Sequence, residues 1–295
     1  MAGKILTAAG AVAVLGLLLP TEQALALPVD LGTAADFALL EIGPGSANVS
    51  ISQGGNVGFI NGDIGIAPAG KLGISAGNFP ISGTVYAWQS DGINTGGNAP
   101  VVVDLDKVNT AASDAMAAWN AAKVLASSGG GVGMSTISVA GGATLNLTPG
   151  VYNLANFTLG NGAQVILAAG GSYVFNISST MKLDHAQILN AAGLAVSEIL
   201  FNFTGDNSKV ATSGGLDNES IINGIILAPY APISLTPGLV NGEIIGGDSI
   251  NIASGGAING TPPSPPPSVP DAGSSLVLMS IGLGCLAAAK RKFIS

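Results

Sequence analysis

The dipeptide Asn-Gly recurs at a fixed spacing near the end of the chain, and this repeat restricts the possible folds more than any other feature. It begins at Asn223, Asn241 and Asn259, so each copy follows the previous one by 18 residues. Each interval contains an apolar pair, a short alternating strand and a Pro or Gly turn. Asn and Gly tolerate positive φ, so we expect them to mark corners. Short strands repeated at such a period predict a β-solenoid, whose coils bury their apolar sides against one another.

The alternation within the repeated strands predicts which side chains point inward. In the segments 145–148, 233–236 and 250–253, large aliphatic residues alternate with small or polar ones. Successive side chains of a strand point to opposite sides of the sheet, so the aliphatic ones should form the inner column. The predicted inner residues are Leu145, Leu147, Ile233, Leu235, Ile250 and Ile252. The outward residues, which we take as the candidate binding surface, are Asn146, Thr148, Ser234, Thr236, Asn251 and Ala253.

The segment 104–128 differs from the rest because it lacks Gly and Pro and is rich in Ala. Asp104 and Asp106 can cap and stabilise the start of a helix, and the glycines 129–131 end it. The apolar residues follow helical steps of three and four. They form the stripe Leu105, Val108, Ala112, Ala115, Trp119, Ala122 and Ala126. We therefore expect a single long helix lying along one side of the solenoid.

Several segments in this order resemble the ice-binding-protein-like β-solenoid family, over roughly residues 30 to 260. They are LGTAADFALL (31–40), INGDIGIAP (60–68), FPISGTVYA (79–87), the long helix, LTPGVYNL (147–154), SYVFNIS (172–178) and NGIILA (223–228). The resemblance implies a right-handed β-helix with three faces and the helix packed alongside. It also implies that N-terminal and C-terminal coils interleave in space. The sequence thus favours a mainly β fold, a right-handed β-solenoid of about 18 residues per coil with one long α-helix.

Composition excludes some functions and weakens others. The chain has 17 acidic and nine basic residues, and the five basic residues between the terminal segments are all Lys. Without a basic stripe, nucleic-acid binding is not expected. The only histidine, His185, has no nucleophile motif or cluster of acids near it in the sequence, so we predict no enzyme and no cofactor. Asp206-Asn207 and 217–219 offer oxygen ligands for Ca²⁺, but their spacing matches no standard loop, so we predict no metal site.

Both ends of the chain are predicted to be targeting segments. Residues 1–26 have a positive start, an apolar run and small residues before position 27, as in a cleaved secretory signal peptide; an N-terminal anchor helix is the alternative. The solenoid domain would then occupy 27–260, and a Pro-rich linker 261–271 would follow. The last part, 272–295, is an apolar membrane segment that ends in Lys290, Arg291 and Lys292. The domain should therefore be exported and at least transiently tethered to the membrane.

The C-terminal segment resembles a VPDSG-type PEP-CTERM sorting signal, although Ala272 replaces the usual Ser. The matching residues are Val269, Pro270, Asp271, Gly273 and Ser274, followed by the apolar run and the basic cluster Lys290, Arg291 and Lys292. The resemblance implies processing by an exosortase in a Gram-negative bacterium. An unprocessed tail anchor remains the alternative.

These features leave two main functional hypotheses. The first is a non-catalytic surface protein that binds ice, or another extended surface, through a flat coil face. The second is an adhesin or matrix component that binds extracellular polysaccharide or a protein partner. The segments NGIILAP and NGEIIGG favour the second, because they resemble the choice-of-anchor A domains of secreted surface proteins. A β-helical carbohydrate enzyme that uses His185 is a third and weaker hypothesis.

Overall fold

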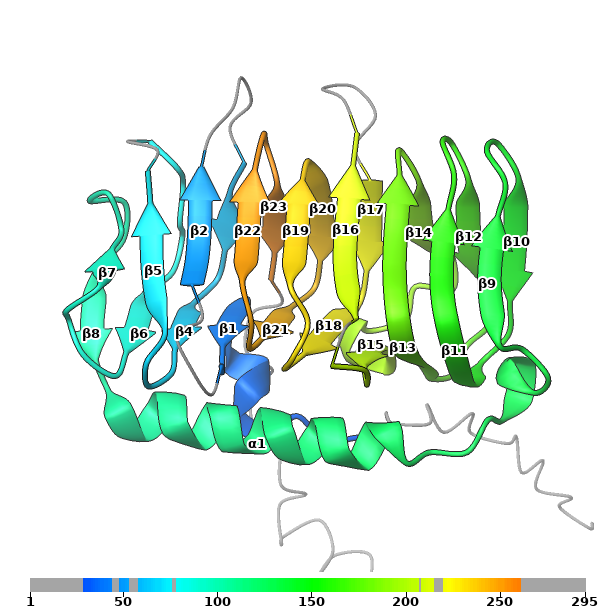
Figure 1. Ribbon diagram of the computed structural model, residues 1–295, viewed down its shortest axis with the longest axis horizontal. Coiled ribbons are helices and arrows are strands. Elements are labelled where there is room, and N and C mark those ends of the chain that lie inside the picture. The colour runs from blue at the N-terminus through cyan, green and yellow to red at the C-terminus, as the bar shows by residue number, and fades with distance from the viewer. Residues whose placement is uncertain are drawn as a thin grey trace, which may run out of the picture.

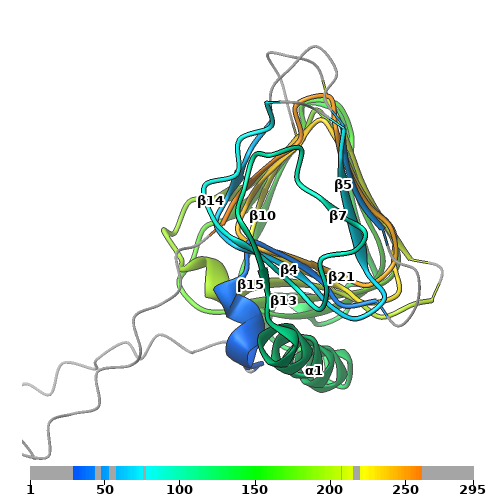
Figure 2. The ribbon, with the colours of Figure 1, turned by 90° about the vertical axis from the view of Figure 1, so that its left-hand side faces the viewer.

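The chain forms a triangular β-solenoid with one helix alongside, which confirms the predicted fold class (Figures 1 and 2). The computed structural model describes residues 29–43, 48–52, 58–75, 78–206, 208–214 and 220–260. The predicted signal peptide and the linker and membrane segment after residue 260 lie outside these ranges. Among the described helices, none has the length and the apolar character that a membrane span needs.

One side of the triangle, which we call the asparagine face, is a seven-stranded parallel sheet. Its strands are, in spatial order, β10 (Thr144–Leu147), β12 (Gln164–Leu167), β14 (Gln187–Asn190), β17 (Ser220–Asn223), β20 (Gly238–Asn241), β23 (Ala257–Asn259) and β3 (Ile60–Asn61).

The other two sides belong to a single 16-stranded sheet, which turns the corner within the long strands β11 (Gly150–Leu159) and β13 (Tyr173–Asp184). The helix face contains the first halves of β11 and β13, then β15 (Ile199–Phe203), β18 (Ile225–Ala228), β21 (Ile244–Gly246), β1 (Leu39–Glu41), β4 (Ile64–Ile66), β6 (Val85–Ala87) and β8 (Val101–Val103). The hydroxyl face contains β9 (Thr136–Val139), the second halves of β11 and β13, then β16 (Lys209–Ser213), β19 (Ile233–Thr236), β22 (Ile250–Ala253), β2 (Asn48–Ser52), β5 (Lys71–Ile74) and β7 (Ile93–Asn94).

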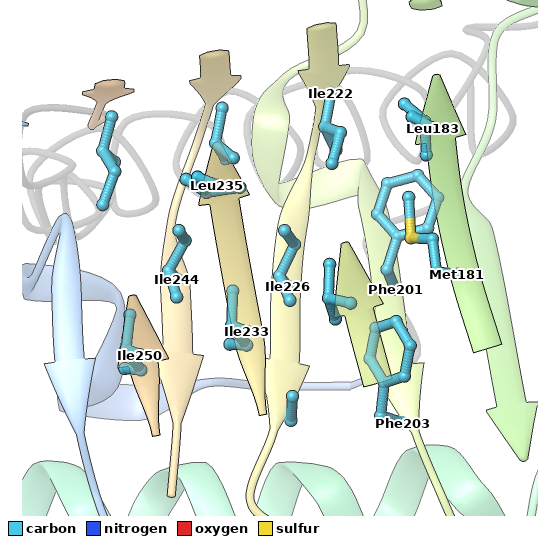
Figure 3. Packing of buried hydrophobic residues seen from close by; sticks show 14 of the residues in the cluster. Met181, Leu183, Phe201, Phe203, Ile222, Ile226, Ile233, Leu235, Ile244 and Ile250 are labelled. Carbon is cyan, nitrogen blue, oxygen red and sulfur yellow. The ribbon is translucent and has the colours of Figure 1, made fainter. Parts of the chain in front are cut away.

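The core is a continuous column of aliphatic and aromatic side chains that all three faces enclose (Figure 3). Ile233 and Ile250, each 1% exposed or less, lie in register on adjacent coils, as do Ile226 and Ile244. Of the predicted inner residues, Leu147, Leu235 and Ile252 are also buried, and Leu145 is partly buried against the same core. Full burial of each such side chain contributes about 1.5–3 kcal/mol, so the stack supplies the stability that a single coil lacks.

The coils do not stack in sequence order. The first coil lies between the last coil and the second one, because β1 pairs with both β21 and β4. In the same way, β2 pairs with both β22 and β5. The chain then travels back along the whole stack in the long helix, so that β9 and β10 form the far end (Figure 1). The N-terminal coils therefore form one block that continues the stack beyond the last coil. The two sets of coils meet at a single junction and do not alternate, so the interleaving that the family resemblance implied is wrong.

The period of 18 residues holds only for the last coils. Asn223 and Asn241 lie 18 residues apart and face one another on adjacent strands. Asn176 is 23 residues from Asn153 and 26 from Asn202, although these residues face one another in the same way. Stacking constrains the strands but leaves the corners free to lengthen. The 26-residue coil contains an additional corner segment with the 3-10 helix η3 (Val196–Glu198).

The predicted helix is present but shorter than expected. Helix α1 spans Leu105–Lys123, and the carboxylate of Asp104 caps it by accepting a hydrogen bond from the Lys107 N–H at 3.0 Å. Its buried residues are Val108, Ala111, Ala115, Ala118, Trp119 and Ala122. The predicted stripe is therefore wrong at both ends, since Leu105 is 45% exposed and Ala126 lies beyond the helix. The small Ala side chains let α1 lie close to the sheet.

Candidate functional site

Four of the six predicted surface residues lie together on the hydroxyl face. Ser234 is in register with Asn251 on the adjacent strand, and Thr236 and Ala253 follow two residues later on the same two strands. All four point outward and are half-buried. The Thr236 hydroxyl donates a hydrogen bond to the Thr212 carbonyl at 3.2 Å, so part of its bonding capacity is used within the sheet.

The two remaining predicted residues lie elsewhere. Asn146 is exposed on β10, the terminal strand of the asparagine face. Thr148 lies beyond the end of β10, where its carbonyl accepts a hydrogen bond from the Tyr152 hydroxyl. The six residues therefore do not form one surface, because outward alternation along a strand does not specify which of the three sides that strand occupies.

Charged amines interrupt the hydroxyl face. Its central outward row runs in register through Ser138, Thr158, Lys182, Ala211, Ser234, Asn251, Ser50, Gly73 and Asn94. Lys182 is exposed in the middle of this row, and Lys209 and Lys71 are exposed beside it. A flat ligand would have to bury or displace these ammonium groups, and desolvating an unpaired charge is costly.

The asparagine face carries a ladder of hydrogen-bonded amides, which we call the asparagine ladder: Asn223, Asn241, Asn259 and Asn61. Each amide nitrogen donates to the amide oxygen of its neighbour, with N···O distances of 3.0 Å from Asn241 to Asn223 and 3.1 Å from Asn61 to Asn259. The bond from Asn259 to Asn241 is longer, at 3.4 Å. In-register amide ladders of this kind stabilise stacked parallel strands.

Both ends of the ladder are held in place. Asn223 donates to the Ile188 carbonyl at 2.6 Å, and the Ser82 hydroxyl donates to the Asn61 amide oxygen at 2.6 Å. The glycines that follow Asn223, Asn241 and Asn61 have φ values of 139°, 147° and 125°, which side-chain-bearing residues rarely adopt. The sequence correctly predicted corners here, but it did not reveal that the preceding Asn side chains bond to each other. The recurrence of Asn every 18 residues was the sequence pattern that could have predicted this ladder.

An apolar row runs beside the ladder, and we call it the apolar row: Ile221, Leu239, Ala257 and Phe59. The first three are in register on adjacent strands, and Phe59 directly precedes β3, which pairs with β23. Phe59 is 38% exposed, and Ile221 and Leu239 are half-buried. No described residue in the seven strands of this face is charged. The whole chain has a formal charge of −8, so a face whose described strands lack charged residues is unusual for it. Such a face can accept an uncharged ligand.

The ladder and the apolar row end before β14. Toward the far end of the same face, polar side chains occupy the other row, as Thr144, Gln164 and Gln187 in register. Ile166 and Leu189 lie in the row that contains Asn146. Asn146 is thus separated from the asparagine ladder by two aliphatic side chains.

The remaining chemical candidates do not form a recognisable catalytic arrangement. His185 is at a corner with φ of 48°, and its Nδ1 lies 2.7 Å from the Asp184 carboxylate. Hydrogen bonds from His185 and Ser213 hold the pKa of Asp184 below its usual value. The described residues contain no group of three or more His, Cys, Asp or Glu side chains that could hold a metal. The Ca²⁺ candidate at 217–219 lies outside them, as does Asn207.

The chain is thus a β-solenoid that offers extended, regularly spaced surfaces. The chain belongs to the family described as the putative ice-binding-like adhesive domain, whose model matches residues 9–260. A VPDSG-CTERM motif matches residues 268–293 and includes every residue that we assigned to the sorting signal. No curated protein sequence matches the chain.

Solved structures of ice-binding proteins share the fold. A glycosylated ice-binding protein from an Arctic yeast superposes with a TM-score of 0.54 at 21% identity, over 82% of this chain and 98% of that one. An ice-binding protein from the Antarctic ascomycete Antarctomyces psychrotrophicus gives 0.50 at 21%, over 78% and 97%. The DUF3494 domain of Shewanella frigidimarina ice-binding protein 1 gives 0.50 at 19%, over 79% and 97%. At these identities the likeness establishes the fold alone.

Proposed function

We propose that this chain is an exported, non-catalytic adhesive protein of the cell surface, which binds an extended ligand through the asparagine face. The family description supports the adhesive role, and the sorting motif that follows the solenoid supports export and attachment at the surface. Membrane attachment through 272–295 and processing by an exosortase belong to the same proposal.

The absence of charge on the asparagine face is the observation that carries the proposal. Its seven described strands present amide, hydroxyl and aliphatic groups only, on a rigid sheet whose strands repeat at about 4.8 Å. Many weak contacts can then act together with little loss of side-chain freedom. Ice and uncharged polymer surfaces both suit such a face, whereas the hydroxyl face would have to desolvate Lys182.

A pair of lysine substitutions can distinguish the two faces. Leu239→Lys on β20 and Ser234→Lys on β19 both alter outward, half-buried positions only five residues apart in the chain. We would display the full chain on a Gram-negative host and measure how many cells remain on ice and on polysaccharide films after washing. Leu239→Lys should reduce retention by about tenfold or more, since it places an unpaired charge in the contact. Ser234→Lys should retain wild-type binding.

Surface levels of both variants must match the wild type for the comparison to hold. If Ser234→Lys alone abolishes retention, the binding surface is the hydroxyl face. If wild-type cells are retained on no surface, the adhesive function itself is contradicted.

A further inference from the structure

The asparagine ladder has hydrogen-bonding capacity that its internal bonds do not use. An amide side chain has two N–H donors and two acceptor lone pairs. Within the ladder, Asn241 and Asn259 each donate one bond to a neighbouring amide and accept one. One N–H and one lone pair therefore remain on each. Asn259 and Asn61 are exposed and Asn241 is half-buried, so these groups are at the surface.

The ladder is also preorganised for binding. Each interior amide is fixed on both sides by its neighbours, and the two ends are fixed by Ile188 and Ser82. A ligand that bonds to these amides would not have to restrict their rotation, which otherwise costs about 0.5–1.5 kcal/mol for each flexible side chain. The same property distinguishes the ladder from isolated surface amides such as Asn251.

The pairing of a polar row with an apolar row defines the chemistry of the ligand. Both rows run along the solenoid axis, across the strands, and repeat once per coil at about 4.8 Å. A pyranose ring has hydroxyl groups at its edge and C–H groups on its face, and a coil's spacing is comparable with the length of one sugar unit. Hydroxyls can therefore bond to the ladder while C–H faces pack on Leu239 and on the ring of Phe59, which is 38% exposed.

Charge restricts the ligand further. The described strands around both rows contain no Lys or Arg that could pair with a carboxylate or sulfate. The net charge of −8 would repel an anionic polymer at low ionic strength. An uncharged polymer needs no basic partner on the protein and is not repelled by its net charge.

We propose that the asparagine ladder and the apolar row form a binding track for a neutral polysaccharide chain that lies along the solenoid axis. The track occupies β17, β20, β23 and β3, and Figure 1 shows β17, β20 and β23 behind β16, β19 and β22. This inference rests on the proposed function, because it names the ligand class of the same face.

Two cellulose derivatives with one backbone test the proposal. The full chain would be titrated with hydroxyethyl cellulose, which is neutral, and with carboxymethyl cellulose, which is anionic. We expect binding to the neutral polymer and at least about tenfold weaker binding to the anionic one in low salt. Asn241→Asp keeps the shape of the amide but removes its N–H donors and adds a charge, so it should weaken neutral-polymer binding by about tenfold or more. Asn251→Asp, at an outward Asn on the hydroxyl face, is the matched control and should bind as the wild type does.

Phe59→Ser provides a second variant that leaves the ladder intact, in case Asn241→Asp does not fold. It should also lose most of the neutral-polymer binding, and a cooperative unfolding transition would show that the variant is folded. The track is overturned if both track variants bind hydroxyethyl cellulose like the wild type, or if the wild type does not bind it. Should Leu239→Lys still abolish cell retention on ice in that case, the proposed function stands and its ligand is ice. If no variant changes retention, the two proposals fail together.

Discussion

At the scale of single residues, Glu41 is the side chain least suited to its surroundings. It ends β1 at the corner between the helix face and the hydroxyl face and is fully buried. Its Oε1 accepts a hydrogen bond from the Gly43 N–H at 2.6 Å, while Oε2 has no hydrogen-bond partner among the described residues. A Cβ on Gly70 would come within 1.7 Å of Oε2, so any larger residue at position 70 would displace the carboxyl group.

Burial raises the pKa of the Glu41 carboxyl from 4.5 to about 7, against the opposing effect of the Gly43 N–H. The folded state therefore binds this proton more tightly than the unfolded state does. The stability that the group provides is complete below pH 4.5 and is lost as the pH rises to about 7.

Replacing the carboxyl group by an amide should remove this pH dependence. Glu41→Gln should resemble the wild type in stability near pH 4 and exceed it above pH 7, by up to about 3 kcal/mol. Denaturant unfolding of both proteins at the two pH values measures the difference. Equal stabilisation at both pH values would show that ionisation of Glu41 is not the cause.

At the scale of elements, a second group of amides attaches α1 to the solenoid. The amide nitrogen of Asn176 lies 2.8 Å from the Ala122 carbonyl and 2.9 Å from the Asn153 amide oxygen, and Asn202 donates to Asn176 at 2.8 Å. Asn153 in turn donates to the Leu125 carbonyl, just beyond the helix. The Ala122 carbonyl also accepts a hydrogen bond from the Leu125 N–H at 3.1 Å, so Asn176 adds a side-chain donor at the C-terminal end of α1. The indole N–H of Trp119 adds a bond to the Phe203 carbonyl at 2.7 Å.

Loss of Asn176 should loosen the helix rather than the whole stack. Asn176→Leu removes the side-chain donor for Ala122, whose carbonyl keeps the Leu125 N–H, and leaves the buried amide of Asn202 without an acceptor. We therefore expect a cost of about 1–3 kcal/mol. Hydrogen exchange should rise in the last two turns of α1. Asn146→Leu, at an exposed strand position, is the control and should leave exchange unchanged. A uniform rise over all coils would contradict a local attachment.

At the scale of the whole molecule, the order of the coils makes the last coil an internal one. The strands β21, β22 and β23 join the N-terminal coils to the rest of the stack, because β1, β2 and β3 pair with them. The described chain ends at Gly260, whose N–H donates to the Asn61 carbonyl at the corner between the asparagine face and the helix face. Gly260 therefore lies in the middle of the solenoid and not at its end.

Truncation should consequently damage both halves of the molecule. In a solenoid stacked in sequence order, removal of the last coil only shortens the array. Here a chain ending at Gly242 should lose hydrogen-exchange protection in β4 and β6 as well as in β18. Retention of full protection in β4 and β6 would show that the N-terminal coils are stable without the C-terminal one.

Much of this architecture could be predicted from the sequence because it depends on local patterns. Alternation in ISLT and INIA identifies Ile233, Leu235, Ile250 and Ile252 as inner residues, and the Gly-free segment after Asp104 identifies the helix. The Asn-Gly repeats locate corners, since positive φ is a property of individual residues. The sorting motif is likewise recognisable from the order of its residues.

Local patterns in the sequence specify the coil, the inner and outer residues of its strands, the helix and the sorting segment. The three-dimensional fold sets which coils are neighbours, and it therefore brings Asn61 to the end of the ladder formed by Asn223, Asn241 and Asn259. It also placed Ser234 and Asn146 on different faces. These features do not follow from local patterns because parallel strands with similar apolar patterns can stack in many orders. The choice among these orders depends on packing and hydrogen bonds between residues that are far apart in the chain.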